Sequence, residues 1–157
     1  MNEFSFVRRA DAEVLQDIDN WIERIEIYLR DFFNGDRERV RGTQFGDCIS
    51  KVVYLSDRAV AEPSIFRGVR DVQGRLQAGA IVEPDSDYLY LDALTNAPWN
   101  VLTNQPETIK GAATSLMEEL VNESFELGYM GRIKLYPLQR SKQFYTDIGF
   151  LTLAAIN

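Results

Sequence analysis

The sequence predicts an α+β, or mixed α/β, fold in which helices pack on one central sheet. Strand-like segments are bunched in the middle of the chain, and long amphipathic helical patterns stand on either side of them. With 157 residues, 45% hydrophobic and 26% charged, the composition is that of an ordinary globular domain. We therefore expect a single domain over residues 1–157, with an N-terminal region (1–62) and a sheet-bearing region (63–157).

One helical pattern dominates the N-terminal region. After a short strand predicted over Phe4–Arg9, apolar residues recur every three or four positions from Val14 to Phe33, which indicates a long amphipathic helix. Asn34-Gly35 should end it, because glycine readily adopts the left-handed C-cap conformation. Residues 36–46 are predicted to form a loop, and Ile49–Leu55 is compatible with either a strand or a helix.

A meander is predicted after Pro63. Two strands, Ile65–Arg70 and Leu76–Val82, flank a tight turn, and a third covers Tyr88–Thr95. Alternation along the third strand assigns its residues to two faces: Leu89, Leu91 and Ala93 to one, and Tyr88, Tyr90, Asp92 and Leu94 to the other.

The second long helical pattern begins near Ile109 and ends at Gly128. A strand over Arg132–Leu138, a short helix from Ser141 to Ile148 and a last strand over Phe150–Ile156 complete the predicted order. The connection from the third meander strand to Arg132–Leu138 is long enough for a parallel crossover.

Missing residue types restrict the possible chemistry. The chain has no histidine and one cysteine, Cys48, which excludes histidine-based triads, histidine-ligated metals and thiolate zinc clusters, so no metal is expected. A single cysteine fits a reducing cytosol, and no apolar run approaches the roughly 20 residues that span a bilayer. The net charge of −7 argues against nucleic-acid binding. We expect a cytoplasmic protein that binds neither membranes nor nucleic acid.

Small residues mark the segment Pro106–Thr114, which joins the best-patterned strand to the second long helix. Small side chains let backbone N–H groups approach a ligand, and the first turn of a helix leaves about four of these donors unpaired. Together with the helix dipole they favour an anion, usually a phosphate. Equally, Gly111, Ala112 and Ala113 would let the helix pack closely on the sheet, and both interpretations remain open.

A second candidate lies in the aromatic segment Phe144–Phe150. Phe144 and Ile148 are four residues apart and should face the core, whereas Tyr145 is one residue off that stripe and can reach a cleft. A phenol with a pKa of about 10 suits proton donation to a departing thiolate. The alternative is a half-buried tyrosine that only packs.

Taken in this order, the meander, the small-residue loop and the Phe-Tyr-x-x-x-Gly-Phe motif resemble the GNAT superfamily of acyl-CoA-dependent N-acyltransferases. The resemblance covers residues 63–150 and is tightest over 88–150. The family's loop pattern is Gln or Arg, two residues, Gly, one residue, then Gly or Ala. Here Gly111 and Ala113 agree with it, whereas Thr108 departs. Leu138 stands where many members carry a cofactor-contacting Asn.

The resemblance implies a mostly antiparallel sheet flanked by helices, whose fourth and fifth strands splay apart at the cofactor site. It also implies direct transfer of an acetyl group from acetyl-CoA to an amine. Tyr145 falls on the general-acid position, and backbone groups near Leu94 and Thr95 would hold the pantetheine arm. The residues implied at the pyrophosphate are Thr108, Ile109, Lys110, Gly111, Ala112, Ala113 and Thr114, with Lys110 supplying the charge that Thr108 lacks.

The sequence gives less information about the general base and the acceptor amine of this implied reaction. Without histidine a carboxylate must deprotonate the amine, and Asp92, beside the pantetheine gap, is the candidate unless it is only a solvated strand residue. Residues 1–62 would form the acceptor side, for a small-molecule or peptide amine. There Arg37, Arg39 and Arg41 either attract an acidic substrate or are merely solvated.

Two further expectations concern assembly and activity. Because the chain leaves room for one strand after Phe150, we expect a second subunit to cover the exposed sheet edge, which gives a homodimer. The alternative to an enzyme is a non-catalytic CoA-sensing or protein-interaction module with the same fold. A plain α+β interaction domain is a third hypothesis.

Overall fold

The computed structural model describes residues 3–151. Its helices are α1 (Ala12–Phe33), α2 (Gln44–Ala61), α3 (Ala112–Glu126) and α4 (Lys142–Asp147), and its strands are β1 (Ser5–Val7), β2 (Phe66–Arg70), β3 (Leu76–Pro84), β4 (Leu89–Asn96) and β5 (Ile133–Leu135). The described residues also form 3₁₀ helices η1 (Arg37–Val40), η2 (Pro63–Ile65), η3 (Pro98–Asn100) and η4 (Gln139–Ser141). None of the helices within residues 3–151 is long and apolar enough to cross a membrane.

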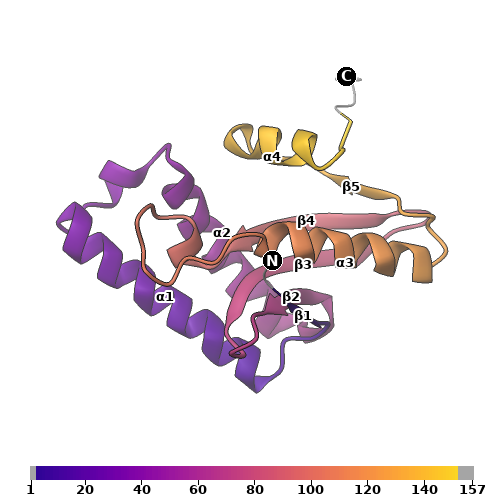
Figure 1. Ribbon diagram of the computed structural model, residues 1–157, viewed down its shortest axis with the longest axis horizontal. Coiled ribbons are helices and arrows are strands. Elements are labelled where there is room, and N and C mark those ends of the chain that lie inside the picture. The colour runs from indigo at the N-terminus through magenta and orange to yellow at the C-terminus, as the bar shows by residue number, and fades with distance from the viewer. Residues whose placement is uncertain (1–2, 152–157) are drawn as a thin grey trace.

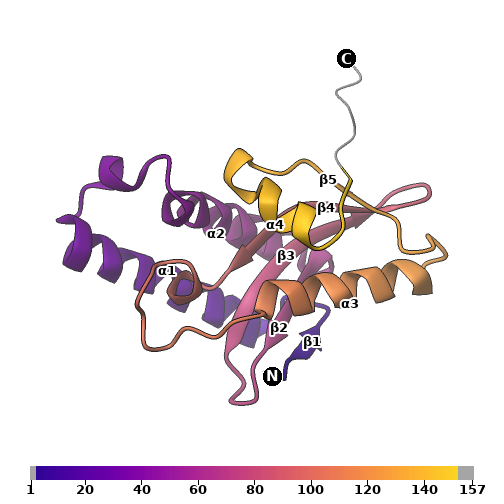
Figure 2. The same ribbon diagram turned by 45° about the horizontal axis from the view of Figure 1, so that its top comes forward.

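The strands form one sheet in the order β1-β2-β3-β4-β5. Neighbours from β1 to β4 are antiparallel, and β4 pairs with β5 in parallel through the crossover that contains α3. Helices α1 and α2 cover one face of the sheet and α3 covers the other (Figure 2). The predicted fold class, a mixed and mostly antiparallel sheet flanked by helices, is confirmed.

Each face of the sheet has its own hydrophobic core. Under α1 and α2, Trp21 and Leu55 pack with Phe66 and Ile81 of the sheet. Under α3, Leu116 and Leu120 pack with strand residues that include Leu89. The first core draws residues from both predicted regions of the chain, 1–62 and 63–157, so the N-terminal helices are part of the packed body of the protein.

The segment Ile49–Leu55, which was compatible with a strand or a helix, lies inside α2. This helix begins at Gln44, within the predicted loop 36–46, so that part of the prediction was wrong. Thr43 caps α2 by accepting a hydrogen bond from the Gly46 N–H at 3.1 Å. The buried residues of α2 are Phe45, Cys48, Val52, Leu55 and Ala59. Their spacing of three and four indicates a helix only over more than two turns, so the short segment Ile49–Leu55 did not reveal it.

The alternation predicted for the side chains of β4 is wrong beyond Leu91, because the strand contains a bulge. Ile81 of β3 lies opposite Ala93 and Val82 lies opposite Leu91, so Asp92 has no partner on β3. One inserted residue reverses the faces of all side chains that follow it. Leu94 therefore packs in the α3 core and Ala93 on the α1–α2 side, opposite to the prediction.

The C-terminal part is shorter in regular structure than predicted. Helix α3 begins at Ala112 instead of near Ile109, and β5 keeps three residues of the expected seven. Pairing of β4 with β5 ends at Leu91 and Leu135, and the two strands then splay apart, as expected (Figure 1). The last predicted strand, Phe150–Ile156, lies mostly outside the described residues.

Candidate functional site

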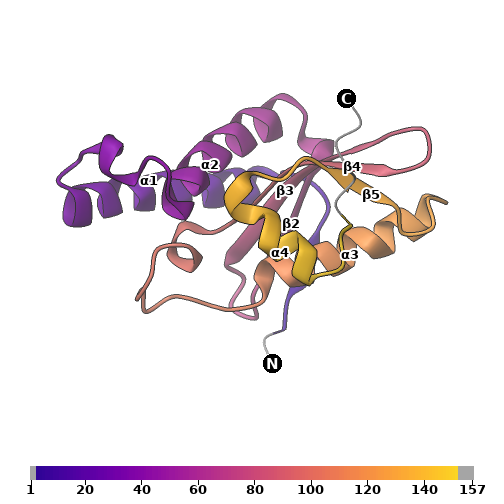
Figure 3. The same ribbon diagram turned by 90° about the horizontal axis from the view of Figure 1, so that it is seen from above.

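Two adjoining cavities open where β4 and β5 separate. The first, which we call the α3 cavity, measures about 210 Å³ and is lined by α2, β4, the start of α3 and the η4–α4 segment. The second, the Asp92 cavity, measures about 200 Å³ and is lined by α2, β4, β5, residues 136–138, Ser141 and α4. Both are lined by Lys51, Leu94, Ser141 and Tyr145, which mark their junction. Seen from above, α4 lies between α2 and α3 (Figure 3).

The N-terminus of α3 presents unpaired backbone donors. Gly111, at φ +92°, occupies the cap position, and no side chain caps the helix. The first hydrogen bond of α3 runs from the Ser115 N–H to the Gly111 carbonyl at 2.9 Å. The N–H groups of Ala112, Ala113 and Thr114 have no acceptor among the described residues. Ala113 lines the α3 cavity, and a Cβ built on Gly111 would meet only Phe4, at 4.0 Å.

Thr108 and Ile109 do not share this role. The Thr108 hydroxyl donates to the Trp99 carbonyl at 2.7 Å, and the Ile109 N–H donates to Asn100 Oδ1 at 2.8 Å. Both residues precede α3, so neither amide belongs to its first turn. The expectation that their polar groups face a phosphate is therefore corrected: these groups hold the loop that leads to α3. Lys110 is exposed beside Gly111.

A buried polar network fixes that loop to the sheet. The side chain of Gln77, 0% exposed, accepts hydrogen bonds from Trp99 Nε1 at 2.9 Å and Asn100 Nδ2 at 2.8 Å. Its amide nitrogen donates to Asp71 at 2.9 Å. Buried polar groups that are all satisfied specify one arrangement, because any other leaves them unpaired. Sequence reasoning missed this network, and one glutamine in an otherwise apolar strand was its only signal.

Tyr145 lies at the junction of the two cavities, where the sequence placed a cleft tyrosine. Its side chain is 7% exposed, and its ring packs edge-on against Phe144 and Phe150 with centroids 5.2 and 5.7 Å apart. Its hydroxyl makes no hydrogen bond within the described residues. Burial raises the pKa of Tyr145 to about 12, so the phenol keeps its proton throughout the physiological range and is available as a donor.

Asp92, the bulged residue of β4, lines the cavity named after it. Tyr54 of α2 donates a hydrogen bond to Asp92 Oδ2, and that bond raises the pKa of Tyr54. Asp92 Oδ1 has no hydrogen-bond partner among residues 3–151 and remains able to accept one. Leu138 lines the same cavity and is 45% exposed. Tyr54 was missed because its helix was not predicted.

Helix α2 also brings charged groups to the cleft. Lys51 is half-buried and lines both cavities, and its Nζ lies 3.4 Å from Ser141 Oγ. Burial lowers the pKa of Lys51. One turn earlier, Asp47 accepts two hydrogen bonds from Arg140 at 2.8 and 2.7 Å, which lower the pKa of Asp47 and tie η4 to α2.

The arginines of the η1 region lie outside this cleft. None of Arg37, Arg39 and Arg41 lines either cavity. Arg37 pairs with Glu26 and Arg41 with Glu38, while Arg39 lies over the Phe33 ring. Their contacts are those of surface residues, and nothing in the cleft supports a role in attracting the substrate.

Comparison of the sequence with protein-family models and with curated proteins gives no match. Solved structures do match. A GNAT-family acetyltransferase from Listeria monocytogenes is similar with a TM-score of 0.53 and 16% identity, over 98% of this chain and 90% of that chain. The PaiA N-acetyltransferase of Thermoplasma acidophilum, in complex with coenzyme A, has a TM-score of 0.52 and 15% identity, over 95% and 90%. The chain has the GNAT fold.

A third similar structure is the N-acetylglutamate synthase of Neisseria gonorrhoeae, complexed with coenzyme A and N-acetylglutamate. It matches with a TM-score of 0.54 and 13% identity over 97% of this chain, but over only 29% of its own length. At such identities the likeness establishes the fold, and an argument about chemistry must come from the cleft itself.

Proposed function

We propose that this protein is an N-acetyltransferase that moves an acetyl group from acetyl-CoA to a primary amine. The observation that carries the proposal is the uncapped start of α3, whose three unpaired N–H groups stand at a cavity that leads to Tyr145. Structures of the same fold that contain coenzyme A support this choice of ligand. When bound, acetyl-CoA supplies the acetyl group as an activated thioester.

The main chain would bind most of the cofactor. The N–H groups of Ala112, Ala113 and Thr114, with the dipole of α3, suit the pyrophosphate, and Lys110 would add positive charge. Beyond Leu91, β4 has no strand on its β5 side among the described residues. Its backbone near Leu94 and Thr95 would pair with the pantetheine amides as a neighbouring strand does, and one N–H would polarise the thioester oxygen.

Asp92 in its cavity and Tyr145 at the cavity junction would move the protons. Asp92 Oδ1 would take a proton from the ammonium form of the acceptor, directly or through water. The amine nitrogen then attacks the carbonyl carbon, so that a C–N bond forms and the C–S bond breaks. Tyr145 would protonate the departing sulfur, and the proton released by the new amide nitrogen would restore the phenol. The products are an amide, free thiol and the one proton left on Asp92.

A second candidate is a CoA-sensing protein without transferase activity. The Thr108 hydroxyl is engaged by Trp99, and Leu138 offers no polar atom, so two side-chain contacts that the family commonly makes to the cofactor are missing. Such a protein would retain the α3 donors and would still bind coenzyme A.

The deciding experiment combines calorimetry with coenzyme A and thiol release from acetyl-CoA across a panel of amines. Tyr145→Phe preserves the ring contacts with Phe144 and Phe150 and removes only the proton donor. We expect it to lower turnover by roughly 100-fold or more, with unchanged affinity for coenzyme A. Binding without thiol release from any amine would favour the sensor, absence of binding would remove both candidates, and full turnover in the variant would exclude Tyr145 as the acid.

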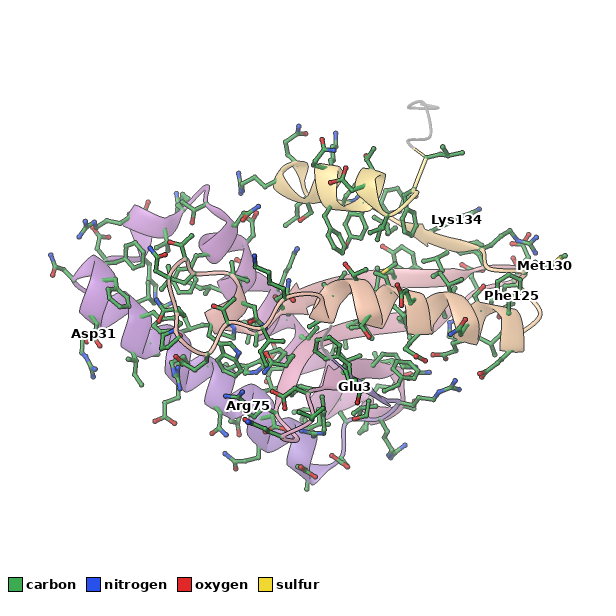
Figure 4. The ribbon with its side chains drawn as sticks, viewed as in Figure 1. Glu3, Asp31, Arg75, Phe125, Met130 and Lys134 are labelled. Atoms are coloured by element: carbon green, nitrogen blue, oxygen red, sulfur yellow. The ribbon has the colours of Figure 1, made fainter. Side chains whose placement is uncertain are left out.

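We also propose that the protein forms a homodimer across the edge of β5. Within residues 3–151, β5 pairs only with β4, and an unpaired edge favours association. Exposed apolar side chains lie nearby: Phe125 and Met130 are at the same end of the molecule as Lys134 of β5 (Figure 4), and Tyr136 follows the strand. Sedimentation velocity should give a dimer at micromolar concentration, and a monomer would contradict the proposal.

A further inference from the structure

We propose that the acceptor is a small amino acid, that is, a primary amine with a carboxylate on the same short skeleton, and that Lys51 binds this carboxylate while Asp92 receives the ammonium group. The inference rests on the proposed acetyl transfer and adds the class of acceptor to it. It comes from the charges that α2 and β4 place along the Asp92 cavity.

Lys51 makes no direct ion pair within the described residues, although it senses the charge of Asp47. Among the described residues no carboxylate lies within ion-pair distance of it, and its one side-chain hydrogen bond, at 3.4 Å, goes to the neutral hydroxyl of Ser141. The nearby Asp47 uses both carboxylate oxygens for Arg140. Burial lowers the pKa of Lys51, and the charge of Asp47, which is shared with Arg140, offsets only part of that effect. A ligand carboxylate in the cleft would supply a direct ion-pair partner.

The negative counterpart stands in the same cavity. Lys51 and Tyr54 are three residues apart on α2 and therefore neighbours on one helix face. Tyr54 holds Asp92 through Oδ2 and leaves Oδ1 open. A ligand lying along this face would meet a positive group and then a negative group, the order that suits a carboxylate next to an ammonium.

The size of the cavity limits the acceptor. The Asp92 cavity measures about 200 Å³, below the roughly 300–1,000 Å³ of pockets that hold drug-sized ligands. A free amino acid suits this space better than a folded protein or a long peptide.

A phosphate of coenzyme A is the rival source of the anion, because Lys51 also lines the α3 cavity. Two observations favour the acceptor. The Asp92 cavity contains Lys51 but no residue of α3, where the pyrophosphate is proposed to bind. Lys51 also shares the cavity junction with Tyr145, the proposed proton donor to the thiolate.

The test compares the wild type with Lys51→Met and with Lys142→Met, a control at an exposed α4 lysine that lines neither cavity. The probes are matched pairs: L-leucine with isopentylamine, L-phenylalanine with 2-phenylethylamine, and L-serine with ethanolamine. For each, kcat/KM is measured by thiol release from acetyl-CoA. Affinity for coenzyme A is measured separately by calorimetry.

We expect at least one amino acid to exceed its decarboxylated partner by about tenfold or more, the size expected of a hydrogen bond to a charged group. Lys51→Met should bring that ratio close to one while the affinity for coenzyme A stays unchanged, and Lys142→Met should alter neither. Lys51→Glu provides a second variant in case the first folds poorly, and it should reverse the preference in favour of the plain amine.

Several outcomes would overturn the inference. The wild type could fail to prefer the carboxylate-bearing member of any pair, or the preference could survive Lys51→Met. If Lys51→Met instead lost affinity for coenzyme A and kept the preference, Lys51 would be assigned to the cofactor phosphate. Failure of the proposed transferase function is recognised independently: either coenzyme A does not bind to the wild type in calorimetry, or it binds and no amine of any pair releases thiol from acetyl-CoA.

Discussion

The two walls of the cleft are held in different ways. One wall, β4 and the loop to α3, is fixed by the buried network of Gln77 and Asn100. The other, the η4–α4 segment, is tied to α2 by the Arg140–Asp47 pair and the Lys51–Ser141 contact, while its aromatic side chains pack in the α3 core. The difference indicates that buried hydrogen bonds fix the wall that leads to α3, whereas the wall carrying Tyr145 also depends on partly exposed contacts.

This division suits a transferase that binds and releases a long cofactor. A donor cradle fixed before binding needs little ordering when the ligand arrives, so less binding free energy is lost. A wall held by exposed contacts can move aside to admit the pantetheine arm and to release product.

The largest effect, on the free energy of unfolding, is expected for a substitution of Gln77, the centre of the network that fixes the wall formed by β4 and the loop to α3. Gln77→Leu would leave the buried Trp99 indole N–H without a partner and would remove one hydrogen bond each from Asp71 and Asn100, and it should lower the free energy of unfolding by about 3 kcal/mol. Urea denaturation measures this change. Gln73→Leu, at an exposed turn residue, is the matched control and should have little effect. A loss below about 1 kcal/mol for Gln77→Leu would mean that the network does not hold the loop.

A smaller effect is expected where the loop meets α3. Thr108→Val keeps the shape of the side chain but removes the hydrogen bond to the Trp99 carbonyl. Because such a bond contributes roughly 1 kcal/mol, we expect about a fivefold loss of affinity for coenzyme A. Acetyl-pantetheine, which lacks the pyrophosphate, should bind as tightly as to the wild type. An equal loss for both ligands would mean that Thr108 does not act through the α3 donors.

The contrast between the walls also explains what the sequence could predict. Local periodicity was sufficient for α1, the meander and α3, because each repeats its own pattern over several turns or residues. It failed at Ala93 and Leu94, because a bulge depends on pairing between strands and leaves no local mark. Within the site, Gly111 and Tyr145 belong to local motifs. Lys51 and Gln77 gain their significance from neighbours distant in the chain, which only the folded structure brings to them.

The smallest effect is expected at the tie between α2 and η4. Asp47→Asn removes the carboxylate that binds Arg140, and exposed ion pairs add little to global stability. The expected change is local: faster hydrogen exchange of amides in residues 139–148, at nearly unchanged global stability. Asp57→Asn, at an exposed α2 residue, is the matched control.

Lowering the pH should affect the wild type in the same way as Asp47→Asn does, because both remove the negative charge of Asp47. Arg140 lowers the pKa of Asp47 below its ordinary value of 3.8, so the stabilisation is complete above that value and is lost as the pH falls through the lower folded pKa. Exchange in residues 139–148 should therefore accelerate in the wild type below about pH 3.8, relative to Asp47→Asn, which lacks the titrating group. If the variant exchanges like the wild type at neutral pH, the aromatic contacts of Tyr145 hold this wall, and the two walls of the cleft are more alike than the contrast above implies.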